Sequence, residues 1–148
     1  LFRSISKVIK DALTEFECNL PGTAFYDPQT DSLFEAYLEV GTAYFVAEFD
    51  GCVVGGAGIG KLAGEVHTCE LQKLYLNKTY RGLGIANMLM DRCEQFAKEA
   101  GYTAIYLETK KELAVAVPFY ERRGYKYIDG PLGNTGHFNC EIQMLKPI

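Results

Sequence analysis

Several features that mark specialised classes of protein are missing from this sequence. Its five cysteines are scattered and none stands in a C-x-x-C pair, which argues against a disulfide framework or a zinc knuckle and favours a reducing compartment, the cytoplasm. No apolar run approaches the length of a membrane span, and no secretory signal pattern is visible. The two histidines, His67 and His137, are isolated and lack the spacing of metal ligands, so we expect no metal site.

Positive charge is also in short supply. Fifteen lysines and arginines against nineteen acidic residues give a net charge of −4, which excludes a broad surface that follows nucleic-acid phosphates but leaves room for a local anion pocket. The length of 148 residues and the 48% hydrophobic content are those of one globular domain spanning 1–148. Tryptophan is absent, whereas 10 tyrosines and 9 phenylalanines favour sheet packing and lined clefts.

Two helices are predicted at the start of the chain. Apolar residues recur at helical spacing from Ile5 to Phe16, which indicates an amphipathic first helix that ends at residues 19–22, Asn-Leu-Pro-Gly. Ser32 and Glu35 then have the spacing of a capping box, in which each side chain bonds the backbone N–H of the other residue. We therefore expect a short second helix there.

A hairpin follows the two helices. The β-type runs 43–49 and 52–59 flank the pair Asp50-Gly51, which is a strong signal for a tight turn between paired strands. The second run contains Gly55, Gly56 and Gly58. Because glycines weaken a strand, they predict a bulge or a close approach by another group at this place.

The rest of the chain alternates strands and helices. A third strand is predicted over 68–76, with Leu71, Lys73 and Tyr75 on one face and Gln72, Leu74 and Leu76 on the other. After it we expect a helix from Ile85 to Gly101, a strand over 104–107, a helix over 113–123, and strands over 125–128 and 138–145. This order predicts a single α/β or α+β domain built on one mixed sheet.

The segment most typical of a function is the glycine-rich connection between the third strand and the long helix. Its sequence is Arg-Gly-Leu-Gly-Ile-Ala at residues 81–86. A helix N-terminus has unpaired backbone N–H groups and a partial positive charge, and glycines let a ligand approach them, so the segment can cradle a phosphate with Arg81 as an added charge. The alternative is that Gly82 and Gly84 only make a tight turn.

Two ligand classes compete for such a cradle. A dinucleotide fingerprint needs a third glycine or alanine where Asn87 stands and an early position in the chain, and Glu108 is only a loose match to the acid that binds the ribose. This interpretation is therefore the weaker one.

The sequence resembles the GNAT superfamily of N-acetyltransferases, which bind acetyl-CoA through a loop of the form Q/R-x-x-G-x-G/A. Arg81, Gly84 and Ala86 fit this form. The hairpin 46–56, the strand Glu-Leu-Gln-Lys-Leu-Tyr-Leu at 70–76, and the late phrase Phe-Tyr-Glu-Arg-Arg-Gly-Tyr at 119–125 match in the family's order over most of the chain. The resemblance implies a mostly antiparallel central sheet flanked by helices, the acyl-CoA N-acyltransferase fold.

The resemblance also implies a role for each matched segment. The CoA pyrophosphate would be held at Arg81, Gly82, Leu83, Gly84, Ile85 and Ala86, and the acetyl-pantetheine arm would lie along Leu74, Tyr75 and Leu76. The N–H of Leu76 would polarise the thioester carbonyl. Tyr120 would protonate the departing thiolate, and Glu70 would deprotonate the amine, often through water.

Each of these catalytic roles has a structural alternative. Tyr120 can simply pack its helix onto the sheet, and Glu70 can pair with a nearby base or orient the loop. Cys69 is a candidate nucleophile for a two-step reaction, but a buried strand cysteine is the better interpretation. For His137, placed at the start of the last strand, a structural role is preferred, with a place beside the cleft as the alternative.

The sequence departs from the family at three points. Leu113 stands where many members have an asparagine that contacts the cofactor, and Pro118 lies inside the predicted helix, where it would remove an N–H and kink the chain before Tyr120. The family's usual first strand is not visible before Ile5 and would lie upstream of Leu1 or be missing.

Together these observations predict an acetyl-CoA-dependent N-acetyltransferase that acts on a primary amine of a small molecule or peptide, without nucleic acid, membrane or metal; a homodimer is compatible with it. Rivals are a non-catalytic acyl-CoA sensor, a dinucleotide oxidoreductase and a pure interaction module. Acidic residues gather in the region that walls the family's acceptor site: Glu15, Glu17, Asp27, Asp31 and Glu35. They favour a cationic acceptor, unless they only form a solvated helix face.

Overall fold

A computed structural model describes residues 2–148, in which one sheet of six strands runs in the order β1-β2-β3-β4-β6-β5. The strands are β1 Ala43–Phe49, β2 Cys52–Lys61, β3 Thr68–Leu76, β4 Ala104–Thr109, β5 Lys126–Tyr127 and β6 Ile142–Pro147. Of the pairings along the sheet, β3 with β4 is parallel and the others are antiparallel. The predicted mixed, mostly antiparallel sheet is therefore confirmed.

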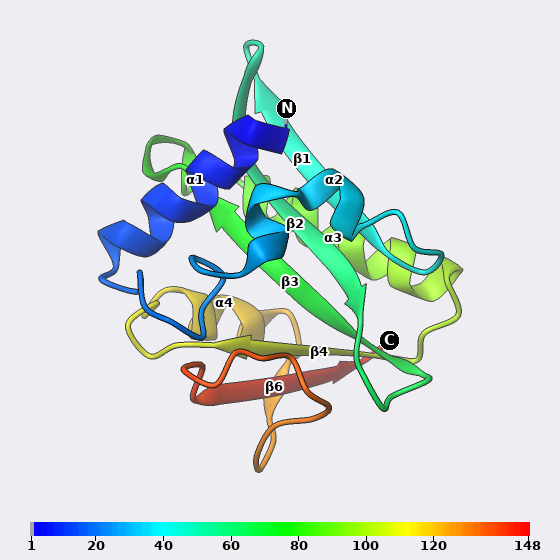
Figure 1. The fold of residues 1–148 in the computed structure, drawn as a ribbon. Helices are drawn as coiled ribbons and strands as arrows, with labels where there is room; N and C mark the ends of the chain where they lie inside the picture. The colour runs from blue at the N-terminus through cyan, green and yellow to red at the C-terminus, as the bar shows by residue number, and fades with distance from the viewer. Residues whose placement is uncertain (1) are drawn as a thin grey trace.

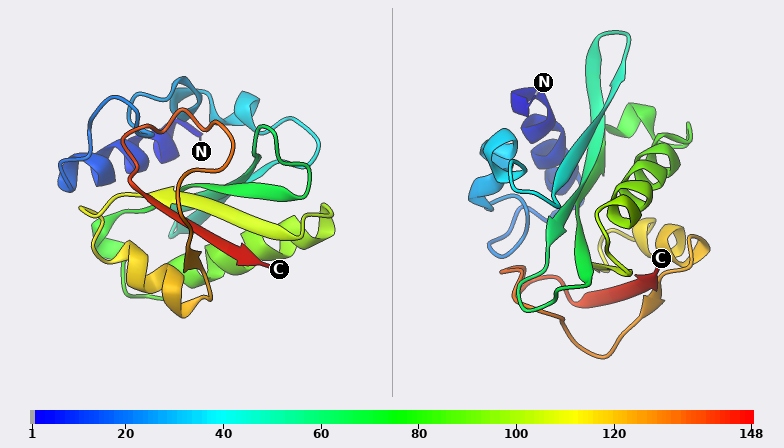
Figure 2. Two further views of the ribbon diagram at one scale, coloured as in Figure 1. Left: turned by 90° about the horizontal axis from the view of Figure 1, so that it is seen from below. Right: turned by 90° about the vertical axis from the view of Figure 1, so that its right-hand side faces the viewer.

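Helices cover both faces of this sheet. They are α1 Phe2–Glu15, α2 Leu33–Ala36, α3 Ile85–Glu99 and α4 Ala116–Arg122, with short 3-10 turns η1 Pro28–Asp31 and η2 Lys78–Tyr80. Figures 1 and 2 show α1 and α2 on one side of the sheet and α3 and α4 on the other. Within the described chain, no helix has both the length and the apolar character needed to cross a membrane.

The two faces bury separate apolar cores. The predicted stripe of α1 is confirmed, since Ile5, Ile9 and Leu13 are almost fully buried against the sheet. On the opposite face, Leu89 and Cys93 of α3 pack with residues of the central strands. Each fully buried aliphatic side chain contributes roughly 1.5–3 kcal/mol, so both layers hold the sheet firmly.

A bulge interrupts β3 at Lys73. The register against β2 shifts between Gly56 and Gly58, and Lys73 adopts a positive φ of 52°. Leu71 and Leu74 consequently pack in the same core, although the prediction placed them on opposite faces. That prediction was wrong past the bulge, because one extra residue reverses the alternation of every side chain that follows.

Beyond this point β3 and β4 separate. Their parallel pairing is limited to Thr68–Glu70 on β3 and Ala104–Tyr106 on β4, whereas β4 remains paired with β6 along its whole length. Figure 1 shows the two strands running apart toward their C-terminal ends. The sheet thus opens at its centre, directly after Glu70.

Side chains from neighbouring elements lie close over the glycines of β2, as the sequence predicted. A Cβ added at Gly56 or Gly58 would lie 2.6 Å from the ring of Tyr44, and one at Gly55 would lie 2.1 Å from Leu76. Since real Cβ atoms do not approach so closely, only glycine fits under these side chains. The bulge and the close approach are both present, so the prediction is confirmed.

The second helix differs from its prediction. α2 is a single turn, and Ser32 makes no capping hydrogen bond with its side chain, which donates instead to the carbonyl of Pro28. The predicted capping box was wrong because Ser32 closes the preceding 3-10 turn η1. A local hydrogen bond competed successfully with the helix cap.

The boundaries of α4, β4 and β6 also differ from those predicted. α4 begins at Ala116 rather than at 113, so Leu113 lies before the helix and Pro118 falls in its first turn, where an N–H has no helical partner to lose. The predicted kink is therefore a wrong prediction. β4 extends to Thr109, and β6 begins at Ile142 rather than at 138.

The family's usual first strand, expected upstream of Leu1 or missing, would lie outside the described residues. α1 already begins at Phe2, and Leu1 lies outside the described residues.

Candidate active site

A cleft of about 710 Å³ occupies the gap between β3 and β4. It is lined at one end by the glycine loop, including Gly82, Gly84 and Ala86, and at the other by Glu70, Glu108 and His137. Between them lie the strand end Leu74, Tyr75 and Leu76, and the helix residues Phe119 and Tyr120. The cleft therefore connects the predicted cofactor residues to the predicted catalytic ones.

The loop before α3 is built from backbone. Gly82 and Gly84 have φ values of 77° and 83°, and Gly84 is the N-cap of α3 without any side-chain cap. An added Cβ at either glycine would meet no protein atom within 4 Å, so the space over the loop is open. The first N–H groups of the 15-residue helix α3 thus point at unfilled space, an arrangement suited to an anion such as a pyrophosphate.

Arg81 has a different role from the one its charge suggests. Its guanidinium donates two hydrogen bonds of 2.9 Å to the carboxylate of Glu15 on α1 and two more to the carbonyl of Leu76. It also lies over the ring of Phe16, 5.1 Å from its centre. The side chain thereby ties α1 to the loop, and the anion-binding capacity of this end rests mainly on backbone groups.

Tyr120 lies in the wall of the cleft. It is 7% exposed, packs edge-on against Phe119 and Tyr125, and has a pKa raised well above its ordinary value, mainly by burial. Among the described residues, the buried side-chain oxygen without a hydrogen-bond partner is the hydroxyl of the neighbouring Tyr125. Tyr120 therefore stays protonated and can act as a proton donor toward the cleft.

Glu70 is the last residue of β3 that pairs with β4, and it is 3% exposed. One of its carboxylate oxygens accepts a hydrogen bond of 2.6 Å from the amide of Gln72. The hydroxyl of Tyr37 holds that amide from the other side, at 2.7 Å. The other oxygen of Glu70 faces the cleft and the ring of His137.

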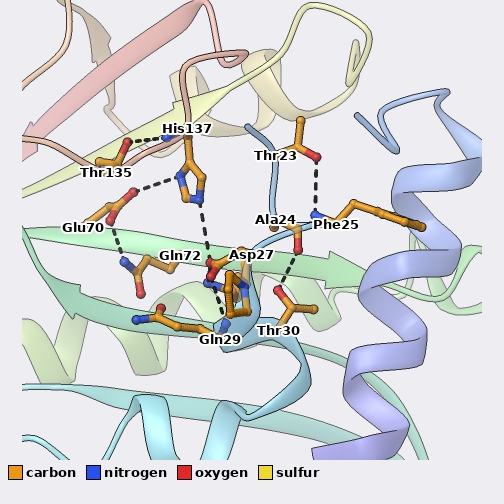
Figure 3. A network of polar contacts seen from close by, with 12 residues as sticks. Thr23, Ala24, Phe25, Asp27, Gln29, Thr30, Glu70, Gln72, Thr135 and His137 are labelled. Carbon is orange, nitrogen blue, oxygen red and sulfur yellow. Dashed lines mark hydrogen bonds and ion pairs between the residues drawn. The ribbon is translucent and has the colours of Figure 1, made fainter. Parts of the chain in front are cut away.

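His137 lies in the loop before β6 and not, as predicted, at the start of the strand, because β6 begins only at Ile142. Its Nδ1 is 3.7 Å from an oxygen of Glu70 and 3.7 Å from one of Glu108, and its Nε2 is 3.9 Å from an oxygen of Asp27. Figure 3 shows the ring between Glu70 and Asp27. The alternative of a histidine beside the cleft is the one that the structure supports.

Glu108 is a member of this group that the sequence did not identify as a functional residue. It sits near the end of β4, where it accepts hydrogen bonds of 2.6 Å from both Tyr106 and Thr135. The backbone N–H of His137 in turn donates to the hydroxyl of Thr135 at 3.2 Å. Glu108 thus fixes the loop that carries the imidazole.

Asp27 and Lys73 form a buried ion pair beside the ring, with 2.6 Å between Nζ and Oδ2. Burial works against the charge of Asp27, yet His137 and Lys73 together hold its pKa well below the ordinary range. For His137, burial also opposes the charge, but the nearby carboxylates of Asp27 and Glu70 raise its pKa to about 9. The imidazole is therefore a cation at neutral pH.

Donor atoms of Glu70, Glu108 and His137 lie within 4.8 Å of one another, a grouping that invites comparison with a metal centre. With Asp27 and Lys73, which also lie beside the ring, the three residues form a group of closely spaced charges that is called the acid–histidine cluster below.

Two other sequence hypotheses can be judged from the geometry. Cys69 is fully buried on the α3 face, and burial raises the pKa of its thiol to about 12, which suits the structural role rather than a nucleophile. Asp31 pairs with Lys10 and Ser6, and neither Asp31 nor Glu35 lines the cleft, so their predicted effect on acceptor binding lacks a structural basis.

Comparison with known proteins bears on the whole domain. Residues 7–125 match the sequence profile of the Acetyltransferase (GNAT) family. The chain is 40% identical over 147 residues to the N-acetyltransferase YjgM of Escherichia coli (strain K12), covering 98% of this chain and 88% of that protein.

Solved structures have the same fold. A GNAT-family acetyltransferase from Staphylococcus aureus Mu50 superposes with a TM-score of 0.87 at 22% identity, covering 99% of this chain and 92% of the other. The PaiA N-acetyltransferase of Thermoplasma acidophilum, solved in complex with coenzyme A, superposes with a TM-score of 0.77 at 16% identity over 99% and 92% of the two chains.

Proposed function

The chain belongs to the Acetyltransferase (GNAT) family, and on that premise we propose that it transfers the acetyl group of acetyl-CoA directly to a primary amine. The observation that carries this proposal is the single cleft that joins the open α3 N-terminus to a buried carboxylate. One end offers backbone N–H groups to a pyrophosphate, and the other offers a base to an ammonium group. Acetyl-CoA would bind at the first of these ends, and the acceptor amine at the second.

The charges of the acid–histidine cluster favour an amine acceptor. Asp27, Glu70 and Glu108 carry three negative charges, while Lys73 and protonated His137 carry two positive ones. The acid–histidine cluster thus holds a net charge of −1 at neutral pH. A single ammonium group would neutralise it, whereas an anionic acceptor would add to the repulsion.

The mechanism follows from what each residue can do. Bound acetyl-CoA supplies an activated thioester, so no covalent enzyme intermediate is required, in keeping with the buried Cys69. Glu70 takes a proton from the ammonium, and the freed amine nitrogen bonds to the acetyl carbon as the bond to sulfur breaks. The backbone N–H of Leu76 stabilises the carbonyl oxygen, and Tyr120 gives its proton to the departing thiolate. The nitrogen of the new amide then releases its extra proton, which restores the hydroxyl of Tyr120, and Glu70 returns its proton to solvent.

Calorimetry with acetyl-CoA tests the cofactor end. We expect the wild type to bind and Gly84→Trp to lose binding, because the indole would occupy the open space above the α3 N-terminus. Gly64→Trp is a matched control, since Gly64 has a φ of 86° and equally open surroundings but lies far along the chain in a loop. Equal affinity of the two variants would refute the assignment of the loop.

Turnover tests the acceptor end. Thiol release from acetyl-CoA should rise when a cationic amine such as spermidine, or a peptide with a free N-terminus, is added, and anionic L-aspartate should raise it less. Binding of acetyl-CoA without thiol release for any amine would instead favour an acyl-CoA sensor. Protection from heat by NAD(P) but not by CoA would favour the dinucleotide alternative.

A further inference from the structure

The imidazole of His137 is surrounded by charged groups from three parts of the chain. Asp27 comes from the loop before η1, Glu70 and Lys73 come from β3, and Glu108 comes from β4. Both ring nitrogens face carboxylate oxygens, which can only accept hydrogen bonds. A neutral imidazole has one N–H and would leave one nitrogen lone pair facing a carboxylate, so this geometry favours the imidazolium.

The two carboxylates at Nδ1 differ in the support they receive from elsewhere. Glu108 accepts hydrogen bonds from two hydroxyls, those of Tyr106 and Thr135, and Glu70 accepts one from Gln72. With the imidazolium removed, two buried carboxylates within 4.8 Å of one another would repel. Glu70 has fewer donors to hold it in place, so Glu70 is the carboxylate that would turn away from its present position.

We propose that His137 is a positioning residue, whose imidazolium keeps the carboxylate of Glu70 directed into the cleft so that Glu70 can deprotonate the acceptor amine. This inference rests on the proposed function, in which Glu70 is the base. It assigns to a loop residue, remote from the family motifs in the sequence, control over the geometry of the catalytic end. The same imidazolium holds the loop 135–137 against Glu108.

The consequence is a pH dependence with two limits. Activity rises with pH as the acceptor amine becomes neutral, and it falls again near pH 9, where His137 loses its proton and no longer holds Glu70 toward the cleft. A base that worked alone would show no such fall, since the free amine only becomes more abundant as the pH increases.

Kinetics of His137→Gln provide the first test, with the best acceptor among the amines named above. We expect kcat/KM at neutral pH to fall to the level that the wild type reaches above pH 9, the fall near pH 9 to disappear, and the KM for acetyl-CoA to stay within about twofold. His67→Gln, which changes the exposed histidine of the chain, is the matched control and should keep the wild-type profile. His137→Lys restores a cation and should recover most of the lost kcat/KM at neutral pH.

Titration of the two imidazoles by NMR provides a second test that needs no acceptor. The signal of His137, assigned by its loss in His137→Gln, should titrate near pH 9 in the wild type and lower in Glu70→Gln. A value near the ordinary pKa of about 6.5 would overturn the proposal.

The two levels of inference can fail separately. If Glu70→Gln is inactive while His137→Gln keeps the wild-type pH profile, the base assignment stands and the positioning role is refuted. If Glu70→Gln is fully active, the base assignment fails and the role of His137 fails with it.

Discussion

The two ends of the cleft are built in contrasting ways. At the α3 end, the polar groups that line the cleft are backbone N–H groups exposed by Gly82 and Gly84, and the nearby Arg81 is paired with Glu15. At the other end, the polar groups are side chains of the acid–histidine cluster, each in contact with a charged neighbour.

This difference has consequences for how each end tolerates change. A backbone site keeps its charge distribution at every pH and is disturbed mainly by filling its space or straining its φ angles. A side-chain cluster can be broken by a single isosteric substitution that removes one charge, because the remaining charges are then buried without partners. Predictions at the two ends should therefore differ in size and in pH dependence.

The largest effect is expected for Glu70→Gln. The amide keeps the size of the side chain but cannot accept the proton of the amine, so kcat should fall by about 1,000-fold, within the range for general bases. Affinity for acetyl-CoA should be nearly unchanged, as measured by calorimetry. Glu65→Gln, on an exposed loop, is the control; a wild-type kcat for Glu70→Gln would exclude the base role.

The next effect concerns stability and pH. Because the pKa of His137 is raised from about 6.5 to about 9 on folding, its charge stabilises the fold in full below pH 6.5, and this contribution is lost as the pH rises through about 9. The difference in unfolding free energy between wild type and His137→Gln should shrink by about 3 kcal/mol between pH 6 and pH 10. Denaturant unfolding at several pH values measures it, and a constant difference would contradict the prediction.

Tyr120→Phe should lower kcat by about 100-fold, less than Glu70→Gln. The thiolate is a fairly good leaving group, because a thiol has an ordinary pKa of about 8.5. The ammonium, with an ordinary pKa of about 10.4, depends more strongly on a base, so loss of the acid should cost less than loss of the base. Thiol-release assays at saturating concentrations of both substrates measure this kcat. Tyr127→Phe, whose ring is 56% exposed, serves as control, and equal activity of both variants would remove the acid role.

The smallest effect is expected at the backbone end, for Glu15→Gln. The ion pair of Glu15 with Arg81 is partly exposed, so its loss should reduce the unfolding free energy by only about 0.5 kcal/mol. Arg81 keeps its hydrogen bonds to the carbonyl of Leu76, and the affinity for acetyl-CoA should change by less than about threefold. A tenfold change would show that side chains matter at this end as much as at the other.

The same contrast explains what the sequence could predict. The glycine loop and the start of α3 are consecutive in the chain, and their chemistry depends on backbone conformation that a short motif specifies. The order of strands and helices was equally accessible, since hydrophobic periodicity and the Asp50-Gly51 turn are local signals. The fold class and the family were both confirmed.

The acid–histidine cluster could not be predicted in this way. Asp27, Glu70, Glu108 and His137 are separated by tens of residues and meet only because β3 and β4 diverge while the loop before β6 folds over them. A signal was available in Glu108, because a carboxylate near the end of a buried strand is a candidate site residue. From the sequence, Glu108 was considered only as a match to a ribose-binding acid. The bulge at Lys73 could not be predicted either, because the residues around it alternate as in a regular strand.

The separation of β3 from β4 also determines how the sheet exchanges hydrogen with water. From Lys73 onward β3 keeps a partner strand only in β2, so the amides directed toward β4 lack a carbonyl to hold them. Deuterium should enter these positions early, although they lie at the centre of the sheet, where exchange is ordinarily slowest. The least protected amides of the domain core would then be those that a ligand in the cleft could shield.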